Sequence, residues 1–257
     1  ITSLVLHSAD WGTTLDALPL LDQPSEAQLN AASQTLQELR LLDKHRRITP
    51  LGKDSLKLPV DVKFASMLLQ LKEESELTGD QSLLIAGCVV TALAEESPRT
   101  EHWLVSDVLR TLAPPVRQSV SRQASRYARL LGCDAKIDAR LNVAEHNLGL
   151  AISLARPGWI ARARNLQEFK LAMGTGAELV QPAATEHLWL AVLAGQRKGT
   201  NLLIRLAQPI EEQLISEHFT ASVSSQQVAF YDAQSDTMKA EERRYFKQIL
   251  LSRKPLA

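Results

Sequence analysis

The sequence is poor in cysteine and has no long apolar run, and each shortage excludes a class of protein. There are only two cysteines in 257 residues, Cys88 and Cys133, far apart in the sequence and in apolar helical surroundings, which fits a reducing cytoplasm better than the disulfide framework of a small secreted domain. The longest apolar run, 83–93, is well short of the roughly 20 residues that span a bilayer. No charged segment precedes an apolar one at the start, so no signal peptide is indicated. We expect a cytoplasmic chain with no membrane partner and two buried, inert thiols.

Motifs for nucleotide hydrolysis and for metal binding are also missing. A phosphate-binding Walker loop needs glycine, four residues and then Gly-Lys-Ser/Thr, but Gly52-Lys53 is followed by Asp54, and Arg47 stands where the first glycine should be. No Asp-Glu-Ala-His sequence occurs, and the six histidines lack the spacing of metal ligands. No GxSxG elbow marks a nucleophile. We therefore expect neither catalysis nor a cofactor in this chain.

The charges balance overall but not locally. The whole chain carries 29 basic and 29 acidic side chains, whereas residues 156–257 carry 13 basic and 10 acidic ones. This small excess favours a polyanionic partner for the C-terminal part.

The N-terminal stretch has the pattern of helices followed by a short hairpin. Apolar residues recur every three to four positions within 25–42, and Ser25 is suited to cap that helix. A basic excursion at 43–47 then returns to Thr49-Pro50-Leu51-Gly52. With short helices predicted at 3–11 and 15–21, this inventory predicts a winged-helix domain over 1–57.

Beyond this stretch, the spacing of apolar residues is helical up to about residue 154 and alternating from residue 159. Helical periodicity continues through a predicted bundle, and its helices are expected at 62–73, 80–94, 101–112, 116–131 and 136–154. From residue 159 an alternating pattern predicts strands at 159–164, 169–173, 188–193, 201–207, 226–231 and 237–251, with one helix at 209–219. These strands suggest a small closed barrel, for which the OB-fold is the obvious candidate. The predicted fold class is a mainly α N-terminal part, a winged helix plus a helical bundle, followed by an all-β OB-fold-like barrel.

Several short motifs resemble the accessory region of DEAH-type helicases, and of the bacterial HrpB-like helicases in particular. They are the Thr-Pro-Leu-Gly turn at 49–52, Leu58-Pro59-Val60-Asp61, Trp11-Gly12, Leu21 to Pro24, Ile160-Ala161-Arg162, Gly174 to Ala177 and Asp232-Ala233-Gln234. The resemblance implies a winged helix at 1–57, a helical ratchet domain at 58–155 and an OB-fold at 156–257. It also implies that ATP and magnesium bind only in two RecA-like motor domains of the same polypeptide. Because the chain begins with Ile1 rather than Met, we expect it to be a piece of that longer protein.

Two groups of basic residues are candidates for binding nucleic-acid phosphates. Arg122, Arg126 and Arg129 are spaced so that they share one face of a helix, with no carboxylate among the neighbouring residues. The alternative interpretation is an ordinary solvated helix face. The opposite face carries Val120, Ala124, Tyr127 and Leu131.

The second group lies on the predicted barrel. Arg162 and Arg164 alternate onto one face of its first strand, and Lys170 on the next strand could lie near them. Trp159 has the opposite parity and is expected in the core. Further basic pairs, at 46–47, 197–198 and 243–244, are expected to be solvated turns or strand ends.

The leading functional hypothesis is an accessory part of an ATP-dependent helicase that binds single-stranded nucleic acid without reading its sequence, RNA rather than DNA. A non-catalytic scaffold with solvated basic faces is the alternative. A free-standing winged-helix regulator is disfavoured because 25–42 offers only Arg40 as a basic residue.

Overall fold

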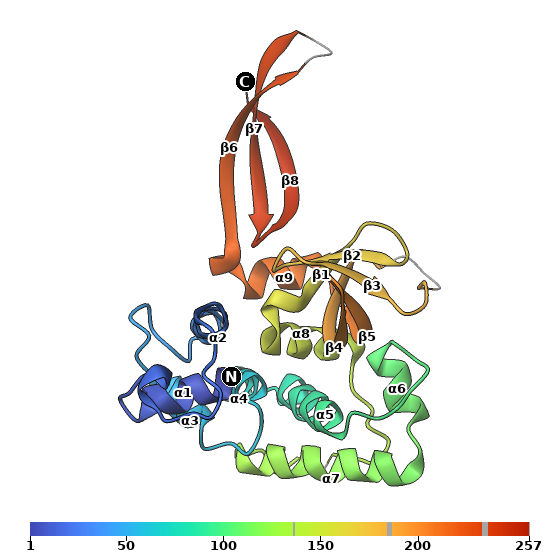
Figure 1. Ribbon diagram of the computed structural model, residues 1–257. Coiled ribbons are helices and arrows are strands. Elements are labelled where there is room, and N and C mark those ends of the chain that lie inside the picture. The colour runs from blue at the N-terminus through green and yellow to red at the C-terminus, as the bar shows by residue number, and fades with distance from the viewer. Residues whose placement is uncertain (136, 184–186, 233–235, 257) are drawn as a thin grey trace. The chain divides into compact units, whose positions relative to one another are not determined.

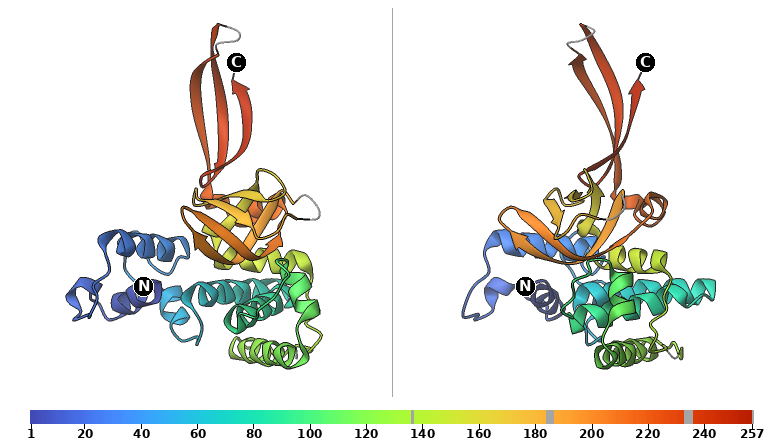
Figure 2. Two further views of the ribbon diagram at one scale, coloured as in Figure 1. Left: turned by 45° about the vertical axis from the view of Figure 1, so that its right-hand side comes forward. Right: turned by 90° about the vertical axis from the view of Figure 1, so that its right-hand side faces the viewer.

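The computed structural model describes residues 1–135, 137–183, 187–232 and 236–256. The chain divides into two compact units, Ile1–Arg99 with Leu109–Ala155, and Thr100–Val108 with Arg156–Ala257. The first unit is helical, and the second contains the strands (Figure 1, Figure 2). The expected order of a helical part followed by a barrel is confirmed.

The described helices of the first unit follow the predicted order, with one helix, Pro50–Ser55, where only a turn was predicted. They are α1 (Thr2–Asp10), the 3-10 turn η1 (Leu15–Ala17), α2 (Glu26–Glu38), α3 (Pro50–Ser55), α4 (Val62–Thr78), α5 (Ser82–Glu96), α7 (Pro114–Leu130) and α8 (Glu145–Ala155). The helix α6 (Val105–Thr111) begins in the second unit and ends in the first. The helix predicted at 136–154 begins only at Glu145, because 137–144 form a loop in which Leu141 has a positive φ of 50°.

Local capping explains where the first helices begin. Ser25 accepts a hydrogen bond from the backbone N–H of Gln28, whose side chain accepts one from the backbone of Ser25, so the two form a capping box. Thr49 caps α3 by accepting from the backbone N–H of Gly52 at 3.0 Å, with Pro50 in the first turn.

Gly52 is required because α3 lies very close to the end of α2. A Cβ at this position would lie 2.4 Å from the carbonyl oxygen of Leu41 and 2.8 Å from Ile48 Cγ1. The Thr-Pro-Leu-Gly turn therefore fixes α3 against a small apolar core. The buried members of that core are Leu6, Leu36, Leu39, Leu41, Leu42 and Val62.

The remaining helices of this unit surround α5, which packs against α4, α7 and α8. Nine of its residues are buried, so α5 is the core helix of this unit. Cys88 lies within it and is free and buried, as is Cys133 after α7. Burial raises the pKa of the Cys88 thiol to about 12.

The second unit is built on a closed barrel of five strands. They are β1 (Ile160–Ala163), β2 (Glu168–Leu171), β3 (Gly176–Leu179), β4 (Trp189–Lys198) and β5 (Asn201–Pro209), in the order β1-β2-β3-β5-β4. A 3-10 turn, η2 (Pro157–Trp159), leads into it. Inward alternation of apolar residues along each strand fills the interior with small and large side chains, among them Ala161, Phe169 and Ile204. The strand β3 was not predicted, because its four residues directly follow a glycine-rich turn.

A segment that precedes the last helices of the first unit packs against this barrel. Leu104 forms a parallel bridge with Ala207, whose backbone N–H donates to the carbonyl of Trp103 at 2.9 Å. The buried side chain of Gln208 accepts from the backbone N–H of Ser106 at 3.0 Å. Residues 100–108, which the division at 155 assigned to the helical domain, thus pack with the strands.

The last three strands form a separate antiparallel sheet, so the prediction of one barrel from all strands was wrong. The strands are β6 (Val223–Asp232), β7 (Thr237–Phe246) and β8 (Ile249–Leu256), and they follow α9 (Glu212–His218) and the 3-10 turn η3 (Thr220–Ser222). The single strand expected at 237–251 is two strands, because Lys247 turns the chain with φ 49°.

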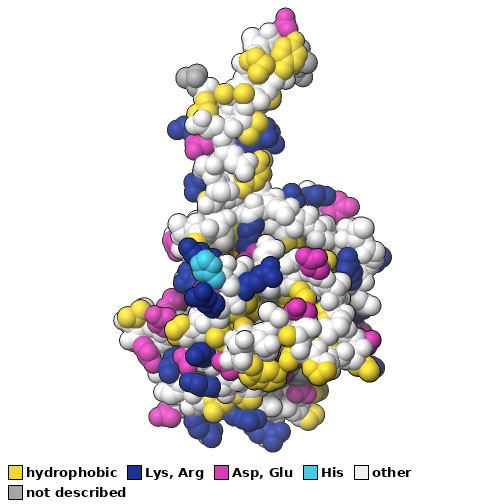
Figure 3. All heavy atoms as spheres, turned by 60° about the vertical axis from the view of Figure 1, so that its left-hand side comes forward, with side chains coloured by type: hydrophobic (Ala, Val, Ile, Leu, Met, Phe, Trp, Pro, Cys, Tyr) yellow, Lys and Arg dark blue, Asp and Glu magenta, His cyan; other side chains and the backbone are white. Residues whose placement is uncertain are grey.

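This sheet has almost no core. Only Phe246 and Ile249, both at its base, are buried among the sheet side chains whose burial is described. Hydrophobic side chains lie along its surface with basic ones among them (Figure 3). Its base is joined to the barrel through the backbone N–H of Gln248, which donates to the carbonyl of Ala172 at 3.1 Å.

Candidate nucleic-acid interface

The arginine row, defined as Arg122, Arg126 and Arg129, lies on the exposed face of α7. All three side chains are exposed, whereas Val120, Ala124 and Tyr127 on the opposite face are at most 3% exposed. The described part of the chain shows no ion pair for any of the three. The predicted division of the helix into an apolar and a basic face is confirmed. The row is open to a ligand from solvent.

A fourth arginine on the same helix has a structural role. Arg117 donates from Nη2 to the carbonyls of Leu112 at 2.8 Å and Arg110 at 3.0 Å. These bonds satisfy carbonyls at the C-terminal end of α6, which a helix leaves without partners. Arg117 therefore holds the turn between α6 and α7, and the three arginines further along remain for other contacts.

Two carboxylates of α5 lie beside α7. The sequence of α7 alone could not predict them. Glu96 accepts a hydrogen bond from Ser119 at 3.0 Å, and Glu95 accepts one from the hydroxyl of Tyr127. Burial, together with that bond to Glu95, raises the pKa of the Tyr127 hydroxyl. The expectation of a surface without carboxylates holds along α7 itself but not at its border with α5. A nucleic-acid strand bound to the arginine row would have to lie on the side of α7 that faces away from α5.

The barrel brings Arg162 and Lys170 together as their parity predicted. They are direct partners in the pairing of β1 with β2, which places both on the outer surface of the barrel. Arg164 follows just beyond the end of β1 and is exposed, whereas Arg162 and Lys170 are half-buried. The register therefore agrees with the predicted grouping of these basic residues.

The side chain of Arg162 contacts other residues of its own unit. Its guanidinium donates to the carbonyl of Leu250 at the start of β8 and lies 5.5 Å from the ring centroid of Trp189. Trp189 in turn donates from Nε1 to Glu212 of α9 at 2.9 Å. The separate sheet and α9 thus meet the outer surface of the barrel at this point. Alternation along β1 could not reveal this, because the covering strand lies 88 residues further along the chain.

Trp159 packs against the barrel core, as its parity predicted. It is a partly buried member of the cluster that contains Ala161 and Phe169. The guanidinium of Arg156 lies 4.6 Å from its ring centroid, which is the geometry of a cation–π contact. This tryptophan is consequently a poor candidate for stacking on a base.

The basic pairs at 46–47, 197–198 and 243–244 differ in whether they form ion pairs. Lys198 forms an ion pair with Glu178 at 2.7 Å, and Arg243 pairs with Glu241. Both contacts are local to the second unit. Arg46 and Arg47, by contrast, have no ion pair among the described residues, and Arg46 donates to Asn30 at 2.8 Å.

No group of three or more His, Cys, Asp or Glu side chains could hold a metal ion among the described residues. No described helix is long and apolar enough to cross a bilayer.

The fold of this chain is similar to one part of two larger solved structures. No protein-family model matches the chain, and no curated protein matches it. A crystal structure of the Escherichia coli DExH-box NTPase HrpB matches with a TM-score of 0.82 and 22% sequence identity, covering 100% of this chain and 30% of that one. The fold is that of one part of HrpB. A crystal structure described as the Escherichia coli DEAH/RHA helicase HrpB gives a TM-score of 0.79 at 22% identity, with the same coverage. The chain thus spans about 30% of the length of these proteins, and the HrpB-like resemblance is confirmed at the level of fold.

Proposed function

We propose that this chain is the C-terminal accessory portion of an HrpB-like, ATP-dependent DEAH helicase. The fold shared over the whole chain with HrpB supports this proposal, as do the sequence motifs of that family. In this proposal residues 1–57 are the winged helix, 58–155 the ratchet domain and 156–257 the OB-fold, with residues 100–108 packed against the barrel.

The proposed activity is sequence-independent binding of single-stranded nucleic acid, RNA rather than DNA. The observation that carries it is the arginine row, three exposed guanidinium groups without an ion pair in the described chain. Successive members are about 4.5–6 Å apart along the helix axis at 1.5 Å per residue, so neighbouring phosphates can each meet one guanidinium. Such contacts hold a strand in register without reading its bases.

On the second unit, Arg164 and Lys170 are the proposed strand contacts. Arg162 is best placed as a positioning residue, because its guanidinium already serves the Leu250 carbonyl. If Arg162 also contacts phosphate, it would have to give up that bond.

The rest of the machinery would belong to the full-length protein. RecA-like motor domains of the same polypeptide would bind ATP and magnesium and would be the partners of this chain in the cytoplasm. The accessory part would let the strand advance during the ATPase cycle and resist its return.

A scaffold without nucleic-acid binding is the second candidate. The internal engagement of Arg162 and the carboxylates beside α7 favour it, because both reduce the free positive charge. The two functions differ in one measurable property, the affinity of this chain for a single strand.

Fluorescence anisotropy with labelled single-stranded RNA and DNA over a range of salt concentrations would separate them. If each arginine of the row contacts one phosphate, a plot of the logarithm of the association constant against the logarithm of the salt concentration should have a slope of about −2, at about −0.7 per contact. Arg122→Ala/Arg126→Ala/Arg129→Ala should flatten the slope by about that amount. A matched control, Arg99→Ala/Arg140→Ala/Lys44→Ala, removes the same charge from exposed positions elsewhere on the unit. Equal losses in both triple variants, or no binding at low salt, would favour the scaffold.

A further inference from the structure

A second basic site lies in the N-terminal unit, away from α7. A pocket of about 510 Å³ is lined by Ala9, Gly12, Thr13, Thr14, Arg46, Arg47, Ile48 and Lys53. Its volume is in the range of small-molecule sites. The lining contains three cationic side chains, two threonines and no carboxylate.

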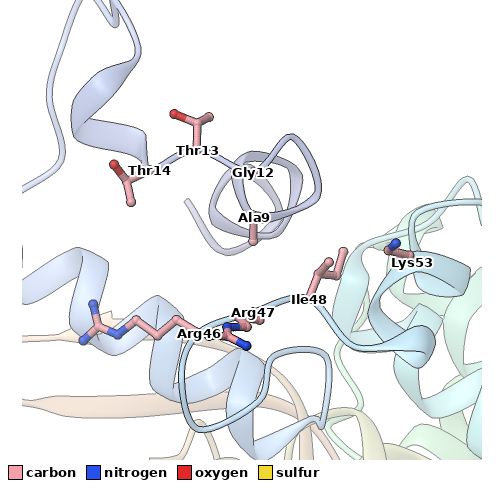
Figure 4. A pocket seen from close by; sticks show the side chains of 8 residues that line it. All are labelled: Ala9, Gly12, Thr13, Thr14, Arg46, Arg47, Ile48 and Lys53. Carbon is pink, nitrogen blue, oxygen red and sulfur yellow. The ribbon is translucent and has the colours of Figure 1, made fainter.

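The wall formed by the threonines is set by the end of α1. Gly12 has φ 73° and donates to the carbonyl of Ala9, while Thr13 donates to the carbonyl of Ser8 at 3.0 Å. This pair of bonds is the Schellman motif that ends a helix at a left-handed residue. It directs the chain away from α1 so that Thr13 and Thr14 line one side of the pocket (Figure 4).

The opposite wall is a tight turn held by Asp43. Its carboxylate accepts hydrogen bonds of 2.8 Å from the backbone N–H groups of both Arg47 and His45. The bond from Arg47 is the main reason that the pKa of Asp43 lies below its usual value. This carboxylate is therefore committed to the backbone of the turn, and Arg47 keeps its charge without an ion pair in the described chain.

Lys53 reaches the pocket from α3, and the close approach at Gly52 fixes that position. The side chains of Arg47 and Lys53 are both exposed, and neither forms an ion pair with a described residue. Arg46 lines the pocket too, but its guanidinium is held by Asn30 at 2.8 Å. Arg47 and Lys53 are thus the two cations that a ligand can recruit.

The geometry points to a phosphate-binding pocket between the end of α1, the turn at 43–47 and α3. The two recruitable cations, Arg47 and Lys53, exceed the single charge of a carboxylate and suit a phosphate dianion or the successive phosphates of a strand. The phosphate could come from a nucleic-acid strand or from a free nucleotide or phosphate ion. The site is independent of the arginine row, because none of its residues belongs to α7.

Two probes and two double variants test this site. Arg47→Ala/Lys53→Ala removes the recruitable cations, and Lys44→Ala/Arg99→Ala removes two exposed cations of the same unit that do not line the pocket. The probes are a labelled single-stranded RNA without terminal phosphates, followed by anisotropy, and AMP or inorganic phosphate, followed by calorimetry. We expect Arg47→Ala/Lys53→Ala to weaken at least one probe about tenfold, while the control stays within about twofold of the unaltered chain.

The pattern of losses identifies the source of the phosphate. Loss of RNA affinity with a salt slope flatter by about 1.4 indicates a strand, at about −0.7 per contact. Loss of AMP or phosphate binding alone indicates a free ligand. If both double variants bind both probes alike, or if the unaltered chain binds neither, the pocket does not bind phosphate and its cations are left for an acidic protein surface. The arginine-row variant, measured beside them, shows separately whether the proposed strand binding fails.

Discussion

The closed barrel and the separate three-stranded sheet share one unit and one strand period, yet they are stabilised differently. Eleven buried residues form the barrel core, whereas only Phe246 and Ile249 are buried in the described side chains of the sheet. The barrel is closed, so all its strands have two neighbours, but β6 and β8 each have one. Alternation alone predicts a strand. Burial on the inward face decides whether that strand has an independent core.

The largest expected effect is on the barrel core. Phe169→Ala removes a side chain that is 2% exposed, and such truncations lower the free energy of unfolding by about 3–5 kcal/mol. Urea unfolding followed by far-UV circular dichroism would measure it. Tyr231→Ala in the sheet is the control, since its side chain is 59% exposed and should change stability by less than about 1 kcal/mol. Similar losses in both variants would contradict the contrast between the two regions.

The next effect concerns the attachment of the sheet. Arg162→Ala removes the bond to the Leu250 carbonyl, and a hydrogen bond from a charged group contributes about 1.5–3 kcal/mol. We expect faster hydrogen exchange in β8 while the amides of β4 and β5 keep their protection. Arg164→Ala, at an exposed position on the same strand end, should leave exchange unchanged. Uniformly faster exchange over the whole unit would show that barrel and sheet open together.

A smaller effect is expected at the turn where the barrel meets the sheet. Gly174 has φ 96°, and a Cβ there would lie 2.2 Å from the side-chain oxygen of Gln248. Gly174→Ala should lower the free energy of unfolding of the unit by about 1–3 kcal/mol, measured by thermal unfolding, and mainly through backbone strain, because the exposed side chain of Gln248 can rotate away. Gly174→Ala/Gln248→Ala removes the contact and keeps the strain, so it should recover only part of the loss. Full recovery would mean that the backbone conformation costs little.

The smallest effect is at the far end of the sheet and depends on pH. The hydroxyl of Tyr231 donates to Asp236, and this bond raises the pKa of the tyrosine. The folded state favours the protonated phenol, so the contact contributes below the ordinary pKa of about 10 and is lost as the pH rises through the higher folded value. Ultraviolet titration should show two late tyrosines, Tyr127 and Tyr231, and only one of them should become normal in Asp236→Asn. A normal titration in the unaltered chain would contradict the contact.

Sequence patterns predicted local structure well and tertiary placement poorly. The parity of Trp159 and the apolar face of α7 were correct, because alternation and helical spacing are properties of a single element. Arg162 was correctly placed on the outer surface, but its partner Leu250 belongs to a sheet that the sequence pattern merged with the barrel. The carboxylates of Glu95 and Glu96 were missed for the same reason, since they reach α7 only through packing. The position of Lys53 beside the pocket depends on the close approach of Gly52 to Leu41, and the spacing of apolar residues gives no sign of that approach.

The bridge between Leu104 and Ala207 also sets an order of events during synthesis. Ser106 leaves the ribosome 102 residues before its partner Gln208, and α7 and α8 are made in the interval. Residues 100–108 must therefore wait, unpaired, while those two helices are made, and then close a long loop whose entropy cost rises only slowly with its length. A barrel expressed from residue 156 onward would lack this segment, and the backbone N–H of Ala207 would lose its partner, the carbonyl of Trp103.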